Sequence, residues 1–577
     1  MTRLQIAILS FGIVNASLYS ALLPLWEGFD EPAHYGYVES LWQTHRLPVL
    51  GRTTFPNDVI ASFRFAPGSY LMHRWLPETT PYEEWFALSE AEKERRRAEL
   101  NSLRPDAGAN TRTNYEAHHP PLAYFLLSLI DQSIPGSPIT ARILIVRLFA
   151  AICSAVLLFF GAVALCRELA LAEPFGCALL LSVFSSQMFY AATAHVTNDW
   201  LAIPLATWLF AAVAAYINKP GMRRSLAAAA WLALGLLTKA YFLAFALWAA
   251  AVVVAMVWRG YTSAKSMLIG TALVVAVAGP WYARNALLYG NVSGTYEAFA
   301  GVGIKQALAA APRINWPAAA GILARGSLWM GNNSGTSFSR ATLYMMLVLL
   351  FLAMAAWARR TTLIGPPEQA VIAGIAIFIV AIAYAACSAF ACRNCTFREA
   401  SPWYTQVLLV PVLALAYLGM SRWNRLGRGL AIGAVALWTW VLFATWTIKL
   451  FPMYSGGGSA PMHLRDVWDW YAHRATARAA DLSLTALAPA PVLYAGLAVS
   501  IALAGILSIA VIRSLQFPPH SDSQIREFGI WKLARNARTL LGVNPRFIRF
   551  IRWISPGVEV LRESGLSHCF GKTSTRT

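Results

Sequence analysis

Charged residues are scarce in this chain, and their scarcity excludes a water-soluble protein. Only 13% of the 577 residues are Asp, Glu, Lys or Arg, whereas 57% are hydrophobic and the mean hydropathy is +0.50. So few polar groups cannot cover the surface of a soluble globule of this size. The composition therefore predicts that the lipid bilayer is the main solvent of the chain.

Cysteine is also scarce, and the apolar runs lack the alternation of barrel strands. The seven cysteines are scattered, and only Cys392 and Cys395 have a suggestive spacing. A zinc site would need two more ligands close by, so we expect either a structural disulfide or no bond. Without alternation, the expected spanning element is the helix, which satisfies its own backbone hydrogen bonds.

Twelve apolar runs are near the length needed to cross roughly 30 Å of hydrocarbon. We predict an all-α polytopic membrane protein with spans at residues 4–26, 143–165, 175–194, 201–217, 225–237, 241–257, 266–281, 341–357, 369–390, 406–419, 429–447 and 491–512. The first run follows a single Arg3 and resembles a signal peptide. Because a polar loop and many further spans follow it, we expect it to stay uncleaved.

The positive charges favour one orientation of these spans. With the N-terminus inside, the cytoplasmic connections carry Lys and Arg at every turn, which explains the net charge of +19 without nucleic acid as a partner. The run 120–133 has about 14 residues, fewer than the ~20 of a span, so we place it in the outer interface. The long outer segments are then 27–142, 282–340, 391–405 and 448–489.

Residues 1–512 form the predicted membrane domain, and residues 513–577 form a basic cytoplasmic tail. The tail has interleaved aromatics and is expected to bind anionic membrane lipids. In the first outer segment, the pattern of Ser89 followed by Glu92 predicts a capping box. We expect it to open a charged helix over Ser89–Leu100. The aromatic pair Trp403 and Tyr404 falls where interfacial belts belong.

The first polar cluster follows the first apolar run directly. It contains Asp30, Glu31 and His34 at the predicted membrane surface. Carboxylates crowded at a low-dielectric boundary have raised pKa values and are suited to act as general bases. The alternative is a hydrated loop whose acids cap a helix.

Two further clusters lie in the same outer compartment. His118 and His119 precede a proline pair, with Glu116 beside them, and Asp199 lies at the end of a span. Two adjacent histidines with nearby acids are suited to ligate a divalent cation. Turn chemistry before the prolines explains them equally well.

Three cations lie in or beside apolar runs: Arg147, Lys239 and Arg284. A cation inside a span costs about 2.5 to 3.5 kcal/mol, so each needs a partner, and an anionic phosphate is one such partner. The alternatives are snorkelling for Arg147 and pairing with Asp199 or Glu31 for Lys239.

The order of these motifs resembles the GT-C superfamily of polyprenyl-phosphate-sugar glycosyltransferases, particularly its protein mannosyltransferase and aminoarabinose transferase branch, glycosyltransferase family 39. The resemblance covers about the first half of the chain. Its motifs are Asp30–Glu31, His119–Leu122, Arg147–Leu148, Asn198–Asp199, Lys239 within GLLTKAYF, and Pro280–Gly290. It implies a GT-C-like bundle of about 12 transmembrane helices, with interfacial helices in a large first extracytoplasmic loop.

The resemblance also implies roles for individual residues. The first outer acid of the family acts as the base or orients the acceptor, which assigns this role to Asp30 with Glu31 beside it. Asp199 matches the second outer acid. The expected substrate-binding residues are His34, His118, Arg147, Lys239 and Arg284. His119 occupies the place at which some members bind a divalent metal.

The second half departs from the family pattern. Many relatives have an arginine and a tyrosine opening a late span, where this chain has Ser401–Tyr404, so the acceptor-side residues are not assigned. The expected reaction is transfer of a sugar from a polyprenyl-phosphate donor to an acceptor, with inversion at the sugar carbon. The donor sugar and the acceptor stay open.

Two other functions are alternatives. A secondary transporter would show related halves and acids near the bilayer midplane, and we see no convincing internal repeat. A polysaccharide polymerase or ligase would rely on loop arginines and histidines without the pair Asp30 and Glu31. The excess of arginine over lysine favours a bacterial inner membrane, with the site facing the periplasm.

Overall fold

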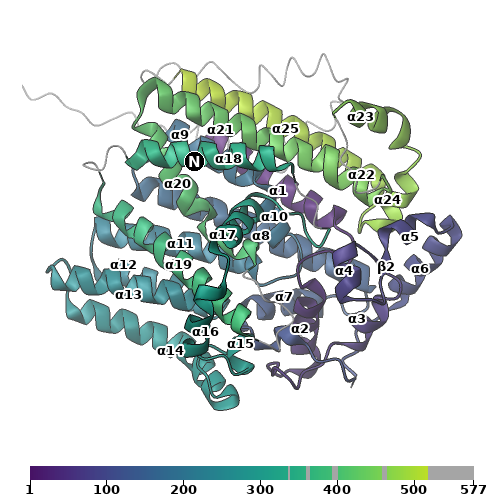
Figure 1. The fold of residues 1–577 in the computed structure, drawn as a ribbon, viewed down its shortest axis with the longest axis horizontal. Coiled ribbons are helices and arrows are strands. Elements are labelled where there is room, and N and C mark those ends of the chain that lie inside the picture. Colours follow the sequence, from purple (N-terminus) through teal and green to yellow (C-terminus); the bar gives the residue numbers. More distant parts are fainter. Residues whose placement is uncertain (109, 335–337, 359–363, 393–400, 458–463, 518–577) are drawn as a thin grey trace, which may run out of the picture. The chain divides into compact units, whose positions relative to one another are not determined.

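The computed structural model describes residues 1–108, 110–334, 338–358, 364–392, 401–457 and 464–517. Among these residues, eight helices are long and apolar enough to cross a membrane (Figure 1). They are α1 (Arg3–Leu22), α8 (Ile139–Glu168), α11 (Asp199–Asn218), α14 (Ala264–Tyr289), α19 (Pro366–Ala391), η4 with α20 (Pro402–Ser421), α21 through α22 (Asn424–Tyr454) and α25 (Ala490–Gln516). A ninth span is the bent pair of α9 (Glu173–Ser185) and α10 (Gln187–Thr193), whose axes differ by 54°.

Each of the twelve predicted runs coincides with one of these helices or with a shorter one. The shorter helices are α12 (Met222–Leu236), α13 (Phe242–Trp258) and α18 (Arg340–Ala358). At 1.5 Å per residue, the 15 residues of α12, the 17 of α13 and the 19 of α18 cover about 22, 26 and 28 Å, which is less than the roughly 30 Å of hydrocarbon. The chain is an all-α polytopic membrane protein, as predicted, although fewer than twelve helices reach full spanning length.

Two predicted spans differ in their bounds. The run 175–194 is broken at Ser186, which separates α9 from α10. The helix that was expected to end at Trp281 contains Pro280 and continues to Tyr289. It ends at Gly290, which has a φ of 70° and takes the left-handed conformation that glycine adopts most readily.

The first outer segment folds into short helices rather than into one loop. Its elements are α2 (Glu31–Thr44), α3 (Asn57–Ser62), α4 (Tyr70–Trp75), α5 (Tyr82–Ala87), α6 (Glu90–Ser102), η1 (Tyr115–His118) and α7 (Leu122–Gln132), with a parallel pair of two-residue strands, β1 (Pro67–Gly68) and β2 (Thr80–Pro81). The predicted interfacial run is thus the short apolar helix α7. Ser89 caps α6 as expected, but the Glu92 side chain bonds Arg95 and Arg96 instead of completing a capping box.

The remaining outer segments also form short helices. They are α15 (Tyr296–Phe299), α16 (Ile304–Ala310), η2 (Ala311–Arg313), α17 (Trp316–Leu328), α23 (Leu464–Asp469), η6 (Trp470–Arg474) and α24 (Ala479–Thr485). The π-helix η5 (Thr445–Leu450) connects α21 (Asn424–Ala444) to α22 (Phe451–Tyr454).

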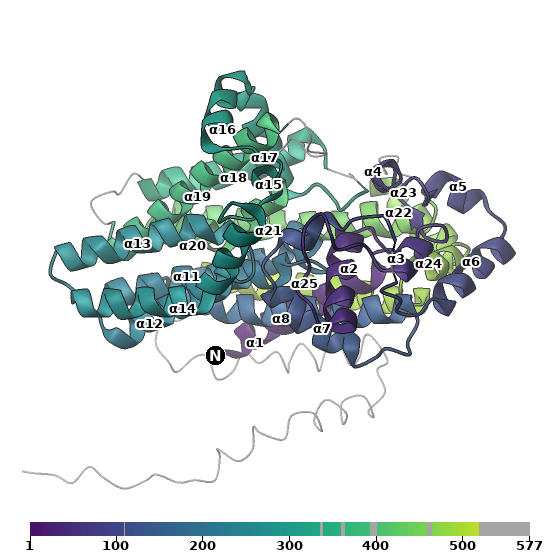
Figure 2. The same cartoon turned by 90° about the horizontal axis from the view of Figure 1, so that it is seen from below.

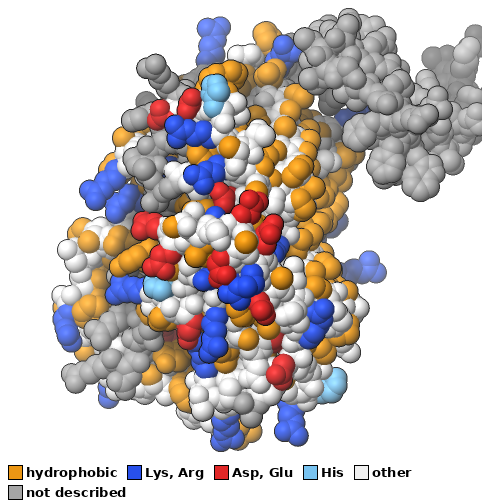
Figure 3. All heavy atoms as spheres, turned by 90° about the vertical axis from the view of Figure 1, so that its right-hand side faces the viewer, with side chains coloured by type: hydrophobic (Ala, Val, Ile, Leu, Met, Phe, Trp, Pro, Cys, Tyr) orange, Lys and Arg blue, Asp and Glu red, His pale blue; other side chains and the backbone are white. Residues whose placement is uncertain are grey.

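The first and last outer segments pack together at one end of the bundle (Figure 2). Lys93 of α6 bonds Asp481 of α24 at 2.8 Å, and the Trp85 indole donates to Thr485. Charged side chains of both signs lie scattered over this end (Figure 3). Cys392 is disulfide-bonded, whereas Cys395 and residues 518–577 of the predicted tail lie outside the described residues.

A buried charge cluster attaches the first outer segment to α8. The Arg142 guanidinium contacts Glu39 of α2 at 3.0 Å, Asp58 of α3 at 2.6 Å and Asp131 of α7 at 3.6 Å. It also donates to the Tyr35 hydroxyl. All of these side chains are buried. Three carboxylates from three helices therefore share one cation, and removing that cation would leave them buried without a counter-charge.

We expect Arg142→Met to destabilise the fold by about 3 to 5 kcal/mol, because breaking a buried ion pair leaves uncompensated charge. The measurement is thermal or denaturant unfolding of the purified protein in detergent. The matched control is Arg95→Met, which removes a solvent-screened surface pair with Glu92 and should change stability little. Equal losses in the two variants would contradict a special role for the cluster.

Candidate active site

The turn after α1 holds Asp30 in a strained position. Trp26 and Asp30 have positive φ angles of 68° and 52°, which non-glycine residues adopt at an energetic cost and chiefly at functional sites. Asp30 precedes α2, yet its side chain does not cap that helix. Instead its Oδ1 accepts a hydrogen bond of 2.8 Å from the Tyr115 hydroxyl. The helix-capping alternative therefore fails for Asp30.

The surroundings of Asp30 favour its protonated form. Burial raises its pKa, and the negative charge of Glu116 raises it further, to about 7. The hydrogen bond from Tyr115 and the charge of Lys239 oppose this rise only in part. The side chain is half-buried, so it keeps access to a substrate. A carboxylate with a pKa close to the working pH is suited to accept a proton.

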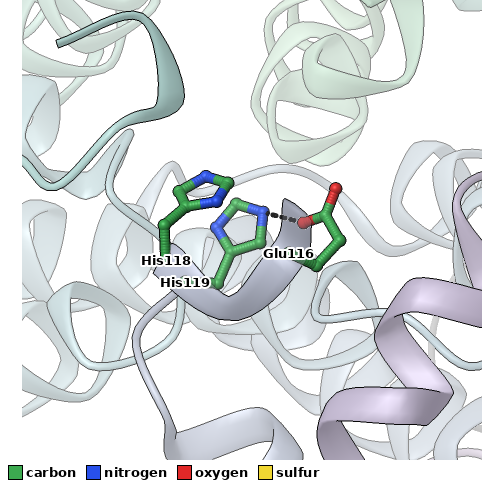
Figure 4. A group of neighbouring side chains, drawn as sticks. All are labelled: Glu116, His118 and His119. Carbon is green, nitrogen blue, oxygen red and sulfur yellow. Dashed lines mark ion pairs between the residues drawn. The ribbon is translucent and has the colours of Figure 1, made fainter. Parts of the chain in front are cut away.

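The second cluster gathers beside Asp30, as the sequence predicted. The side chains of Glu116, His118 and His119 converge (Figure 4), and one ligand atom of each lies within 4.8 Å of the others. His119 Nε2 lies 2.5 Å from Glu116 Oε2. His34 is close too, with its Nδ1 2.7 Å from the Tyr124 hydroxyl and 3.8 Å from Glu116.

The histidines of this cluster are neutral near pH 7. Burial, together with the positive charge of Lys239, lowers the pKa of His118 to about 4 and that of His119 to about 3. Burial also raises the pKa of Glu116. Neutral imidazoles keep a lone pair for a cation. The sequence placed Glu116 in this cluster but gave it no role of its own, and its position two residues before His118 was the available signal.

Asp199 and Lys239 form the third part of the site. Lys239 Nζ lies 2.7 Å from Asp199 Oδ2, and the Tyr241 hydroxyl donates to the other carboxylate oxygen. This is the pairing foreseen as the alternative for Lys239. Its ammonium also lies over the Tyr404 ring, 4.8 Å from the centroid. Both charges are near enough to shift the pKa of Asp30 in opposite directions.

Trp403 and Tyr404 lie at this site rather than in an interfacial belt. The Trp403 ring stacks on Phe29, with centroids 4.2 Å apart and planes 8° from parallel. Phe29 immediately precedes Asp30. The structure adds what local sequence does not show, namely that η4 packs against α10 and α11.

Glu31 and Arg147, both predicted for the site, bond each other in the structure. Both side chains are fully buried and bond each other through two N–H···O contacts, one of them 2.7 Å long. The other N–H groups of Arg147 donate to the carbonyls of Ser20, Leu23 and Pro24. An arginine has five N–H donors, and all five are used, so none remains for a lipid phosphate. Glu31 also accepts from the Val196 amide, and the pair has a structural role.

Arg284 lies apart from the contacts that join the other predicted residues. Its described contacts are a hydrogen bond to the Pro48 carbonyl and stacking over the Trp281 ring. The structure thus brings together Asp30, His34, His118, His119, Asp199 and Lys239.

Glu27 is a second buried carboxylate without a cationic partner among the described contacts. Its Oε2 accepts from the Ser69 amide and the Tyr82 hydroxyl, whereas Oε1 has no hydrogen-bond partner among the described residues. Burial raises its pKa from 4.5 to about 7. The pKa of Glu27 is higher in the folded protein than in the unfolded chain. The folded protein therefore loses stability as the pH rises from 4.5 through about 7, because the buried carboxyl must then ionise.

We expect Glu27→Gln to stabilise the protein at pH 8, by up to about 3 kcal/mol, and to change little at pH 5. The amide still accepts from Ser69 and Tyr82 but cannot ionise. The measurement is the unfolding midpoint of both proteins at the two pH values. Glu83→Gln, at an exposed glutamate of α5, is the control and should show no such difference between the two pH values. A Glu27→Gln effect independent of pH would contradict the raised pKa.

Known proteins were compared with this chain by sequence and by structure. No curated protein sequence matches it. The crystal structure of ArnT from Cupriavidus metallidurans bound to undecaprenyl phosphate is 12% identical and covers 87% of this chain and 77% of its own, with a TM-score of 0.41. The apo structure of the same protein is 13% identical and covers 74% and 72%, with a TM-score of 0.36. The family model described as Predicted membrane protein (DUF2142) matches residues 16–393, more than half of the chain, so the chain belongs to this family.

Proposed function

We propose that this protein is a membrane glycosyltransferase that moves a sugar from a polyprenyl-phosphate donor to an acceptor on the extracytoplasmic side. The observation that carries the proposal is the environment of the Asp30 side chain. It is a half-buried carboxylate with a pKa of about 7 that makes no helix cap and lies beside Lys239 and the histidine cluster. The donor class follows from the order of motifs that resembles the GT-C superfamily.

The proposed reaction assigns one proton transfer to Asp30. Its carboxylate accepts the proton of the acceptor hydroxyl or amine, whose heteroatom then attacks the sugar carbon. The bond from that carbon to the phosphate oxygen breaks, and the polyprenyl phosphate leaves with the bonding electrons. Displacement in one step inverts the sugar carbon. The Tyr115 hydroxyl orients the base through its hydrogen bond.

The departing phosphate needs positive charge in its vicinity. Because Arg147 is fully engaged by Glu31 and backbone carbonyls, Lys239 is the cation of the site that remains for this role. We further propose that Glu116, His118 and His119 hold a divalent metal. They fit it, because one carboxylate and two neutral imidazoles offer ligand atoms within 4.8 Å of one another. A bound metal would supply Lewis-acid stabilisation of phosphate charge.

The periplasm of a bacterial inner membrane is the proposed compartment of the site. Cys392, at the predicted outer end of α19, is disulfide-bonded, and disulfides persist in oxidising compartments. A transporter remains the second candidate, because a broken span such as α9 with α10 also marks substrate pathways.

We expect Asp30→Asn to reduce release of polyprenyl phosphate by about 10²- to 10⁴-fold, the usual contribution of a general base. The assay uses purified protein in lipid with a panel of polyprenyl-phosphate sugars. Glu27→Gln is the matched control. It removes a buried carboxylate of similar pKa three positions away whose bonds go to Ser69 and Tyr82, and it should keep its activity. Solute transport without sugar transfer across the panel would favour the transporter.

We expect the protein to bind one divalent metal through the second cluster. After stripping with a chelator and reloading with Zn²⁺ or Mn²⁺, metal analysis of the parent should find about one ion per chain, because three ligand atoms converge there. The double variant His118→Ala with His119→Ala should contain no bound metal. The control is His45→Ala with His73→Ala, at histidines of the outer segment beyond the cluster. Equal metal content in all three proteins would contradict the site.

A further inference from the structure

Six side chains form an open series of contacts beside Asp30, which begins at His195 and ends at Asp199. Phe29 stacks on Trp403, Trp403 contacts Tyr404 edge-on, and Tyr404 lies under the Lys239 ammonium. Lys239 pairs with Asp199 at one end of the series. At the other end, His195 makes an edge-on ring contact with Phe29 and a 3.2 Å contact to the Phe29 carbonyl. The Lys239 ammonium is a point charge suited to phosphate, whereas the Phe29–Trp403 stack is uncharged.

The stack has the form of a supported platform. Phe29 is buried and packs between His195 and Trp403, so it cannot turn away. Trp403 is half-buried although Phe29 covers one side of its ring, so part of the indole stays open. Aromatic faces carry negative partial charge. They attract the weakly positive C–H groups on the apolar face of a sugar ring, and they offer nothing to a phosphate.

Two polar groups at or next to this series have no hydrogen-bond partner among the described residues. Asn198 is fully buried at the start of α11, and neither atom of its amide has a hydrogen-bond partner among the described residues. His195 Nδ1 is equally without one. Buried polar atoms normally have partners, because leaving them unpaired costs about 1 to 3 kcal/mol each. An amide both donates and accepts, so a hydroxyl group is a matching partner.

We propose that Trp403, supported by Phe29, and the amide of Asn198 bind the sugar ring of the donor, which rests on the proposed glycosyltransferase function. The ligand class is a sugar ring with one apolar C–H face and hydroxyls on its edge. Asn198 is closed off from solvent, so side chains around it must move before a sugar can reach its amide. These residues select the sugar, while Asp30 and Lys239 act on the proton and the phosphate.

This assignment accounts for two observations that an interfacial belt leaves unexplained. A belt tryptophan presents its ring to lipid headgroups, whereas the Trp403 ring is parallel to a buried phenylalanine beside the proposed base. The unsatisfied amide of Asn198 lies one residue from Asp199, within the same polar site.

The experiment measures steady-state kinetics in lipid nanodiscs with the donor on which the parent turns over. Trp403→Leu and Asn198→Ala are each expected to raise the KM for that donor at least 10-fold while kcat changes less than 3-fold. Trp403→Phe keeps an aromatic face and should stay within about 3-fold of the parent KM. Inhibition by sugar-free polyprenyl phosphate should be unchanged in all three, since the lipid phosphate is bound elsewhere. Trp258→Leu, at an exposed tryptophan, is the control.

The outcomes separate this inference from the proposed function. If the parent turns over and Trp403→Leu keeps the parent KM and the parent preference among donor sugars, the sugar subsite is wrong and the glycosyltransferase stands. If no donor turns over with the parent, both are overturned. If Trp403→Leu unfolds, Asn198→Ala and Trp403→Phe decide, because proteins with parental unfolding midpoints report on binding alone. Weaker inhibition by sugar-free polyprenyl phosphate would assign these residues to the lipid and overturn the inference.

Discussion

The buried ion pair of Arg147 and Glu31 is the contact on which the geometry of the site depends. Arg147 extends from α8 and donates to the carbonyls of Ser20, Leu23 and Pro24. It therefore gives hydrogen-bond partners to backbone carbonyls at and just after the C-terminal end of α1. Through Glu31 it also holds the start of α2. The few residues between these anchors must turn sharply, which explains the positive φ of Trp26 and Asp30. Asp30 consequently points toward Tyr115 instead of capping its own helix.

Unequal access to cations divides the carboxylates of this region into two groups. Burial raises the pKa of Glu31, but the charge and hydrogen bonds of Arg147 outweigh burial and hold it below its usual value. Glu27 and Asp30 lack such a partner, and burial raises the pKa of each to about 7. Neighbouring acids whose environments separate their pKa values are the usual basis of acid and base roles. Carboxylates with a lowered and with a raised pKa thus lie within five residues of each other.

Distant segments complete the site. The first outer segment supplies Asp30 and the histidine cluster, α11 supplies Asp199, and the residues before α13 supply Lys239. The second half of the chain contributes η4, whose aromatic residues cover Phe29 and Lys239. Arg142 of α8 pairs with carboxylates of α2, α3 and α7, and so holds these helices of the first outer segment against the bundle. The site therefore depends on packing between elements that have little stability alone.

The sequence by itself determined the membrane class, the helices at all twelve apolar runs, the short helix α7 and the cap of α6 at Ser89. Each of these depends on the hydropathy or capping of neighbouring residues, which a linear sequence displays. It also grouped Asp30, the histidines, Asp199 and Lys239 correctly. Only the tertiary structure decided that Arg147 pairs with Glu31, 116 positions away, and that Trp403 stacks on Phe29. Partner choice depends on three-dimensional proximity and on competition among buried charges, and neither is encoded in local spacing.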